Sequence, residues 1–140
     1  MTKCLAATYE FMKLYCKGIQ KNSGHNRMWI LDNSMKLKEH LTTLNESNSK
    51  AKSVSTWDFS TLYTTIPHDK LKAEIKELFQ FAFTKSDSGF FCVNHKKAFL
   101  SNKEYKSYMT VDLSLAALFL DYLIDNIYVE FGNSLHRQTI

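Results

Sequence analysis

The segment from Leu113 to Tyr128 constrains the fold most, because it is apolar on almost every side. A helix of this kind is normally buried, so the chain must supply other elements to cover it. Its longest uninterrupted apolar run, Leu115 to Leu120, is far shorter than the roughly 20 residues that cross a bilayer. We therefore predict a largely buried helix, with Asp121 and Asp125 on its exposed stripe, and no membrane-spanning segment.

Apolar residues spaced three or four apart predict three further helices, over residues 4–20, 35–45 and 67–83. The turn residues 22–24 end the first helix, and any residue of the run Asp32-Asn33-Ser34 can cap the second. Pro67 and Asp69 both suit the first turn of the third helix, because proline needs no amide donor there and aspartate complements the helix dipole.

Three segments indicate strands. Alternation over Val54 to Phe59 places Asp58 on the face opposite two aromatic side chains. Residues 90–100, after the turn signal at 87–89, form a plausible hairpin around Asn94-His95-Lys96, and residues 128–137 form another around Gly132-Asn133. The predicted fold class is α+β, with several helices packed on one side of a small antiparallel sheet. With 140 residues, the chain is expected to form one domain.

Positive charge is concentrated in the first part of the chain. Residues 1–56 hold nine Lys or Arg and four acidic residues, whereas residues 57–140 hold nine and ten. This distribution fits contact with a polyanion such as nucleic acid, but on charge alone lysines spread over solvated helix faces are the better interpretation. Four lysines are candidate contacts of this kind: Lys36, Lys38, Lys50 and Lys52.

Cysteine usage indicates the compartment. The three cysteines, Cys4, Cys16 and Cys92, are an odd number without paired spacing, which argues against a disulfide framework. The first residues do not resemble a signal-peptide core. We expect an intracellular, not a secreted, protein. Cys92 and His95 offer two possible zinc ligands, but a closed zinc site needs four, so ordinary packing of Cys92 is the better interpretation.

The most informative segment is Trp57-Asp58-Phe59-Ser60-Thr61-Leu62-Tyr63-Thr64-Thr65-Ile66-Pro67. A carboxylate between two aromatics needs a cation, a hydrogen-bond donor or water. At the end of a strand it can bind Mg²⁺, which prefers carboxylate and phosphate oxygens, or it can simply cap the following turn.

This segment resembles the first catalytic motif of reverse transcriptases, most closely that of Penelope-like retroelements. The preceding Met28-Trp29-Ile30-Leu31-Asp32-Asn33-Ser34 and the later residues 124–140, with Phe131-Gly132-Asn133 and Gln138, resemble the flanking stretches of that family in the same order. The resemblance implies a partial fingers and palm over residues 51–140, preceded by a helical, basic region over 1–50. Template–primer nucleic acid and deoxynucleotide would be the partners.

The resemblance also implies roles for three residues. Asp58, with the backbone carbonyl of Phe59, would hold Mg²⁺, and Tyr63 would lie against the sugar of the incoming nucleotide; Tyr63 as a core aromatic remains an equal alternative. Two-metal chemistry needs further carboxylates, and the chain contains no Asp-Asp pair. The second motif, Gly-x-x-Met-Gly, is expected directly after Ile140.

We therefore expect a fragment of a reverse transcriptase that is inactive alone and, with an unpaired strand edge, poorly soluble. Two alternatives stay open. One is a nucleic-acid-binding remnant without catalysis, and the other is an unrelated α+β interaction domain in which Asp58 only caps a turn.

Overall fold

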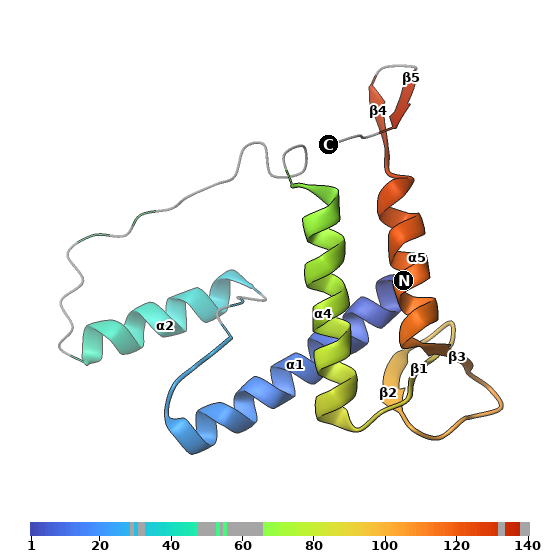
Figure 1. The fold of residues 1–140 in the computed structure, drawn as a ribbon. Helices are drawn as coiled ribbons and strands as arrows, with labels where there is room; N and C mark the ends of the chain where they lie inside the picture. Colours follow the sequence, from blue (N-terminus) through green and yellow to red (C-terminus); the bar gives the residue numbers. More distant parts are fainter. Residues whose placement is uncertain are drawn as a thin grey trace. The chain divides into compact units, whose positions relative to one another are not determined.

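The structure is a computed structural model that describes residues 1–28, 30, 33–47, 53, 55, 66–131 and 134–137. These residues contain helices and two small antiparallel sheets, which confirms the predicted α+β class (Figure 1). The chain divides into two compact units, and each is described by itself. Unit 1 comprises Met1–Tyr15 and Thr61–Ile140, and unit 2 comprises Cys16–Ser60.

Helix α1, Thr2–Ser23, confirms the helix predicted over residues 4–20. It is followed by Gly24, whose φ of 73° is a left-handed conformation that glycine adopts at little cost. Three residues near its start, Cys4, Ala7 and Thr8, are buried. They lie three or four residues apart, so one side of the first two turns contributes to the core of unit 1.

Helix α2, Ser34–Glu46, belongs to unit 2 and confirms the helix predicted there. Asn33, one of the three candidate caps, begins it: its side-chain oxygen accepts a hydrogen bond from the backbone amide of Lys36 at 3.1 Å. This satisfies one of the amides that a helix start leaves without a partner. No residue of α2 is buried.

Helix α4, His68–Ser86, follows Pro67, which is the N-cap and not, as predicted, a residue of the first turn. The ψ of Pro67 is 119°, an extended value, so the helical dihedrals begin only at His68. The helix ends at Asp87, which has a φ of 51°. Aspartate tolerates this left-handed conformation better than most residues, and the predicted turn at 87–89 is confirmed.

The three-stranded sheet contains β1, Phe90–Val93, β2, Ala98–Ser101, and β3, Met109–Asp112, in the order β2-β1-β3. Strands β1 and β2 form the predicted hairpin. Strand β3 was not predicted. It pairs antiparallel with the free edge of β1, with Phe91 opposite Val111.

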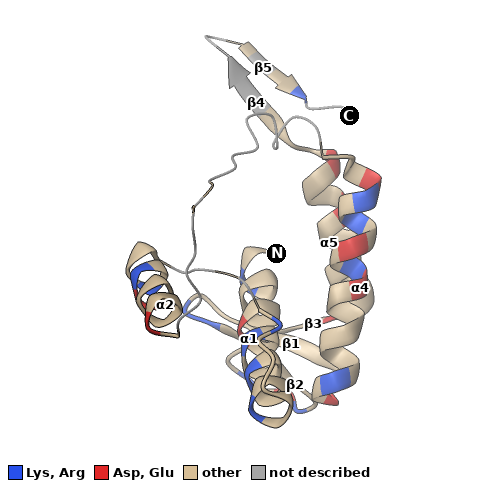
Figure 2. Cartoon of the chain, turned by 90° about the vertical axis from the view of Figure 1, so that its left-hand side faces the viewer, with Lys and Arg blue, Asp and Glu red and all other residues tan. Residues whose placement is uncertain are grey.

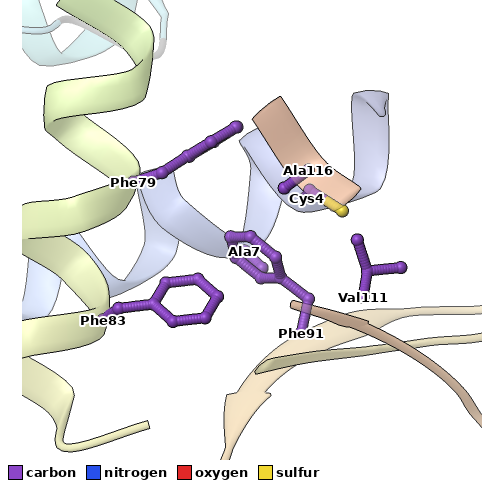
Figure 3. Packing of buried hydrophobic residues seen from close by; sticks show 7 residues of the cluster. All are labelled: Cys4, Ala7, Phe79, Phe83, Phe91, Val111 and Ala116. Atoms are coloured by element: carbon purple, nitrogen blue, oxygen red, sulfur yellow. The ribbon is translucent and has the colours of Figure 1, made fainter. Parts of the chain in front are cut away.

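The core of unit 1 lies on one face of this sheet. Helix α4 supplies Phe79 and Phe83, whose rings meet the ring of Phe91 edge-on at centroid distances of 5.5 and 4.9 Å (Figure 3). These edge-to-face contacts add to the stabilisation from burial. The remaining members of the cluster come from α1, β3 and α5: Cys4, Ala7, Val111 and Ala116. The predicted one-sided packing of the helices is confirmed, with α1 as an additional contributor.

Helix α5, Leu113–Asp125, starts with Asp112 as its cap and is shorter than predicted, because Tyr128 already belongs to a strand. The prediction that α5 is largely buried is wrong. Ala116, Leu120 and Ile124 form the buried stripe, and four apolar side chains on other sides are exposed: Leu118, Phe119, Tyr122 and Leu123. Within the described part of unit 1, α4 and β3 contact this helix.

Strands β4, Tyr128–Phe131, and β5, Ser134–Arg137, pair antiparallel and confirm the second predicted hairpin. The strand predicted over residues 54–59 lies outside the described residues, apart from Ser55. In the part of the chain that the structure describes, no helix is long and apolar enough to span a membrane.

Candidate functional site

Most of the predicted catalytic motif lies outside the described residues. This holds for Asp58, Phe59 and Tyr63, and also for Lys50 and Lys52. Their roles therefore stay predictions from the sequence. The described end of the motif is Ile66 and Pro67, which lead directly into α4.

The junction with α4 is well defined. The carbonyl of Pro67 accepts a hydrogen bond from the amide of Leu71 at 3.0 Å, which closes the first turn of the helix. Asp69 in that turn is placed favourably toward the positive end of the helix dipole. The motif segment is thus attached at its C-terminal end to a rigid element of unit 1.

Helices α4 and α5 are joined by two ion pairs. Lys72 Nζ lies 2.5 Å from Asp125 Oδ1, and Lys76 Nζ donates a hydrogen bond to Asp121 Oδ2 at 2.8 Å. Figure 2 shows acidic and basic residues, coloured red and blue, along α4 and α5. The side chains of Asp121 and Asp125 keep 37% and 45% of their exposure, and each also pairs with a lysine of α4, which was not predicted.

Asp125 belongs to the ion pair with Lys72, which lies nearer the start of α4 than Lys76 does. The hydrogen bond from Lys72 lowers the pKa of the Asp125 carboxyl, and the positive charges of Lys72, Arg137 and His68 lower it further. The same hydrogen bond raises the pKa of Lys72. Arg137 Nε also donates to the backbone carbonyl of Asp125 at 2.7 Å, which ties β5 to the end of α5. Both aspartates of α5 are thus engaged in ion pairs with lysines of α4.

The two described candidate lysines of unit 2 do not form one surface. Lys36 and Lys38 are two residues apart on α2, and residues with this spacing point to different sides of a helix. Lys38 is exposed, whereas Lys36 is half-buried. A phosphate backbone that contacts one of them therefore does not reach the other from the same side.

Unit 2 also has an open hollow of about 440 Å³ between the end of α1 and α2. Met28, Ile30 and Leu37 give it an apolar lining, and His40 contributes a polar ring.

Sequence reasoning missed one group of residues. Lysines and aromatic side chains are interleaved over residues 96–108. The structure brings Phe99, Tyr105 and Tyr108 together on the face of the three-stranded sheet opposite the core, and Lys97 Nζ lies over the Phe99 ring. The signal was present in the sequence as basic residues interleaved with Phe99, Tyr105 and Tyr108, but without β3 their common location could not be recognised.

Within the described ranges, no group of three or more His, Cys, Asp or Glu side chains could hold a metal ion. Comparisons of the chain with protein-family models, with curated proteins and with solved structures found no match.

Proposed function

We propose that this chain carries the metal-binding first motif of a reverse transcriptase related to those of Penelope-like retroelements. The observation that carries the proposal is the segment Trp57 to Pro67, in which Asp58 stands between two aromatics and precedes Tyr63 by five residues. The α+β class of the described residues is compatible with part of the fingers and palm.

In such an enzyme, Mg²⁺ ions would activate the primer hydroxyl and neutralise the triphosphate of the deoxynucleotide. Asp58 and the carbonyl of Phe59 would be ligands, and Tyr63 would select against a 2′-hydroxyl. Two metals need more than one carboxylate, and the aspartates of α5 are bound to Lys72 and Lys76. We therefore propose that the 140 residues by themselves do not catalyse nucleotide transfer.

A metal titration tests the role of Asp58. Mn²⁺ is the probe, because its free concentration can be followed by electron paramagnetic resonance. We expect weak binding by the wild-type chain, loss of that binding in Asp58→Asn, and retention in Asp69→Asn, the matched control on a fully exposed aspartate. Equal binding by all three proteins would contradict the proposal.

A primer-extension assay tests whether the 140 residues lack carboxylates that catalysis needs. With an RNA template, a DNA primer, deoxynucleotides and Mg²⁺, the chain alone should incorporate no nucleotide. Appreciable incorporation that disappears in Asp58→Asn would show that the carboxylate set is complete after all.

A second candidate, an interaction domain unrelated to polymerases, is favoured by the exposed face of α5. Leu118 is 62% exposed and Tyr122 is 71% exposed, and adjoining apolar side chains of this kind are typical of protein contacts. In that case Asp58→Ala would lower the free energy of unfolding by only about 0.5–2 kcal/mol, the value of a lost cap, and would leave Mn²⁺ binding unchanged.

A further inference from the structure

The connection between β2 and β3 crosses the outer face of the three-stranded sheet, the face opposite the core. Because the strand order is β2-β1-β3, residues 102–108 must pass over β1 to reach its other edge. Phe91 faces the core, so its neighbour Cys92 faces outward. Cys92 is nonetheless fully buried, and its Sγ lies 3.6 Å from the carbonyl oxygen of Lys103 in the crossing segment. The crossing segment therefore covers the outer face.

An aromatic cluster lies on this covered face. Phe99, which pairs with Cys92 across the strands, meets the rings of Tyr105 and Tyr108 edge-on at 5.6 and 5.2 Å. The two tyrosine rings are 6.0 Å apart. Tyr105 is 45% exposed, so the cluster presents a supported ring to solvent.

Both loops at this face are held by local hydrogen bonds. The side chain of Asn94 accepts from the amides of Lys96 and Lys97, each at 2.9 Å, which fixes the β1–β2 turn. In the crossing segment, the amide of Tyr108 donates to the carbonyl of Tyr105 at 2.9 Å. A surface that is ordered before binding loses less conformational entropy when a ligand arrives.

The two loops at this face are rich in lysine. Glu104 is the one acidic residue between positions 94 and 109. Four exposed lysines lie on the two loops: Lys96, Lys97, Lys103 and Lys106. Lys97 Nζ lies over the ring of Phe99, 5.4 Å from its centroid. Val93 pairs with both Ala98 and Met109, so the turn and the end of the crossing segment lie at the same end of the sheet.

We propose that this outer sheet face binds single-stranded nucleic acid. Proteins that bind single strands combine a positive surface for phosphates with aromatic rings on which bases stack. Tyr105 supplies the stacking ring, Phe99 and Tyr108 support it, and the four lysines contact the phosphates. The proposal goes beyond the proposed polymerase motif, because it involves none of that motif's residues and requires no metal.

Binding of a fluorescent oligouridylate, measured by anisotropy at several salt concentrations, tests this proposal. Tyr105→Leu, which keeps an apolar side chain but removes the stacking ring, should weaken binding by about 5- to 100-fold. Tyr105→Phe should bind like the wild type. The matched control is Tyr122→Leu on α5, which should also bind like the wild type.

The lysines are tested in the same assay. Replacing Lys96 and Lys106 together by glutamine should reduce the slope of log affinity against log salt by about one to two. Lys36→Gln with Lys38→Gln tests the competing candidate contacts on α2 and should leave the slope unchanged. If only this second pair reduces the slope, the outer face is not the contact surface and the proposal is overturned.

Two further outcomes separate this proposal from other interpretations. If Tyr105→Leu binds like the wild type and polyglutamate binds as well as the oligouridylate does, the face recognises an acidic peptide and the proposal is overturned. Asp58→Asn should not change binding of the oligouridylate. The Mn²⁺ titration can therefore fail while the outer face still binds nucleic acid, and the reverse can also occur.

Discussion

The two faces of the three-stranded sheet are built from neighbouring residues but differ in chemistry. On the inner face, Phe91 and Val111 are covered by apolar residues of three helices, and the surrounding cluster contains no charge. On the outer face, Cys92 and Phe99 are covered by one short crossing segment that is rich in lysine and tyrosine. The inner face therefore supplies stability, whereas the outer face offers a surface that is ordered and still accessible.

Removing a core ring should have the largest effect and tests the first half of this comparison. Phe91→Ala should lower the free energy of unfolding by about 3–5 kcal/mol, because it leaves a cavity between Phe79 and Phe83. Met109→Ala, at a 57% exposed position of the same sheet, should change it by less than about 0.5 kcal/mol. Urea unfolding measures both, and similar losses would show that the inner face is not the core.

Thiol labelling tests whether the crossing segment truly covers the outer face. Burial raises the pKa of both Cys4 and Cys92, so each is protected as a neutral, inaccessible thiol. Alkylation followed by peptide mass spectrometry should modify Cys16, which is only half-buried, at least about tenfold faster than the other two. Rapid labelling of Cys92 alone would mean that the outer face is open.

Helix α5 also has a buried and an exposed side, and substitutions on each should change the free energy of unfolding differently. Tyr122→Gln, on the exposed side of α5, should change the free energy of unfolding by less than about 0.5 kcal/mol. Leu120→Ala, on the buried side, should cost about 2–5 kcal/mol. Thermal unfolding followed by circular dichroism compares the two variants. A large loss in Tyr122→Gln would show that this side of α5 is covered in solution.

The ion pair between Lys72 and Asp125 should have the smallest effect, which is present near neutral pH and is lost toward both extremes of pH. Because the pKa of Asp125 is lowered on folding, its contribution is present at neutral pH and is lost as the pH falls through the lowered pKa. The raised pKa of Lys72 adds a contribution that is lost as the pH rises through the raised value.

Unfolding curves from acid to neutral pH measure this contribution. Asp125→Asn should flatten the acid side of the stability profile, whereas Asp69→Asn should change it less, because Asp69 is fully exposed and 3.5 Å from Lys72. Identical profiles for the wild type and Asp125→Asn would mean that the pair adds nothing to stability.

Local signals explain which elements could be predicted from the sequence. Apolar spacing together with Asn33, Pro67 and Gly24 marked the helices closely, and the turn at Asn94 marked the first hairpin. Strand β3 could not be predicted, because its four residues pair with β1, and β2 and the crossing segment lie between β1 and β3 in the sequence. Neither the exposed side of α5 nor the lysines that pair with its aspartates follow from one helix's own periodicity.

The two candidate sites also differ in whether a local sequence signal or the tertiary structure reveals them. The resemblance of residues 57–67 to a polymerase motif is a local sequence signal, and the predicted roles of Asp58 and Tyr63 depend on that signal alone. The outer sheet face depends instead on strand order, because Phe99 and Tyr105 meet only when the crossing segment passes over β1.

Photochemical crosslinking is the most direct test of the outer face as a nucleic-acid contact. An oligonucleotide that contains 4-thiouridine is irradiated with the full chain, and crosslinked peptides are identified by mass spectrometry. We predict that the crosslinks map to residues 103–108, with Tyr105 as the main site, and that Tyr105→Leu removes them. Crosslinks confined to α2 or to other surfaces, and unchanged in Tyr105→Leu, would contradict the proposal.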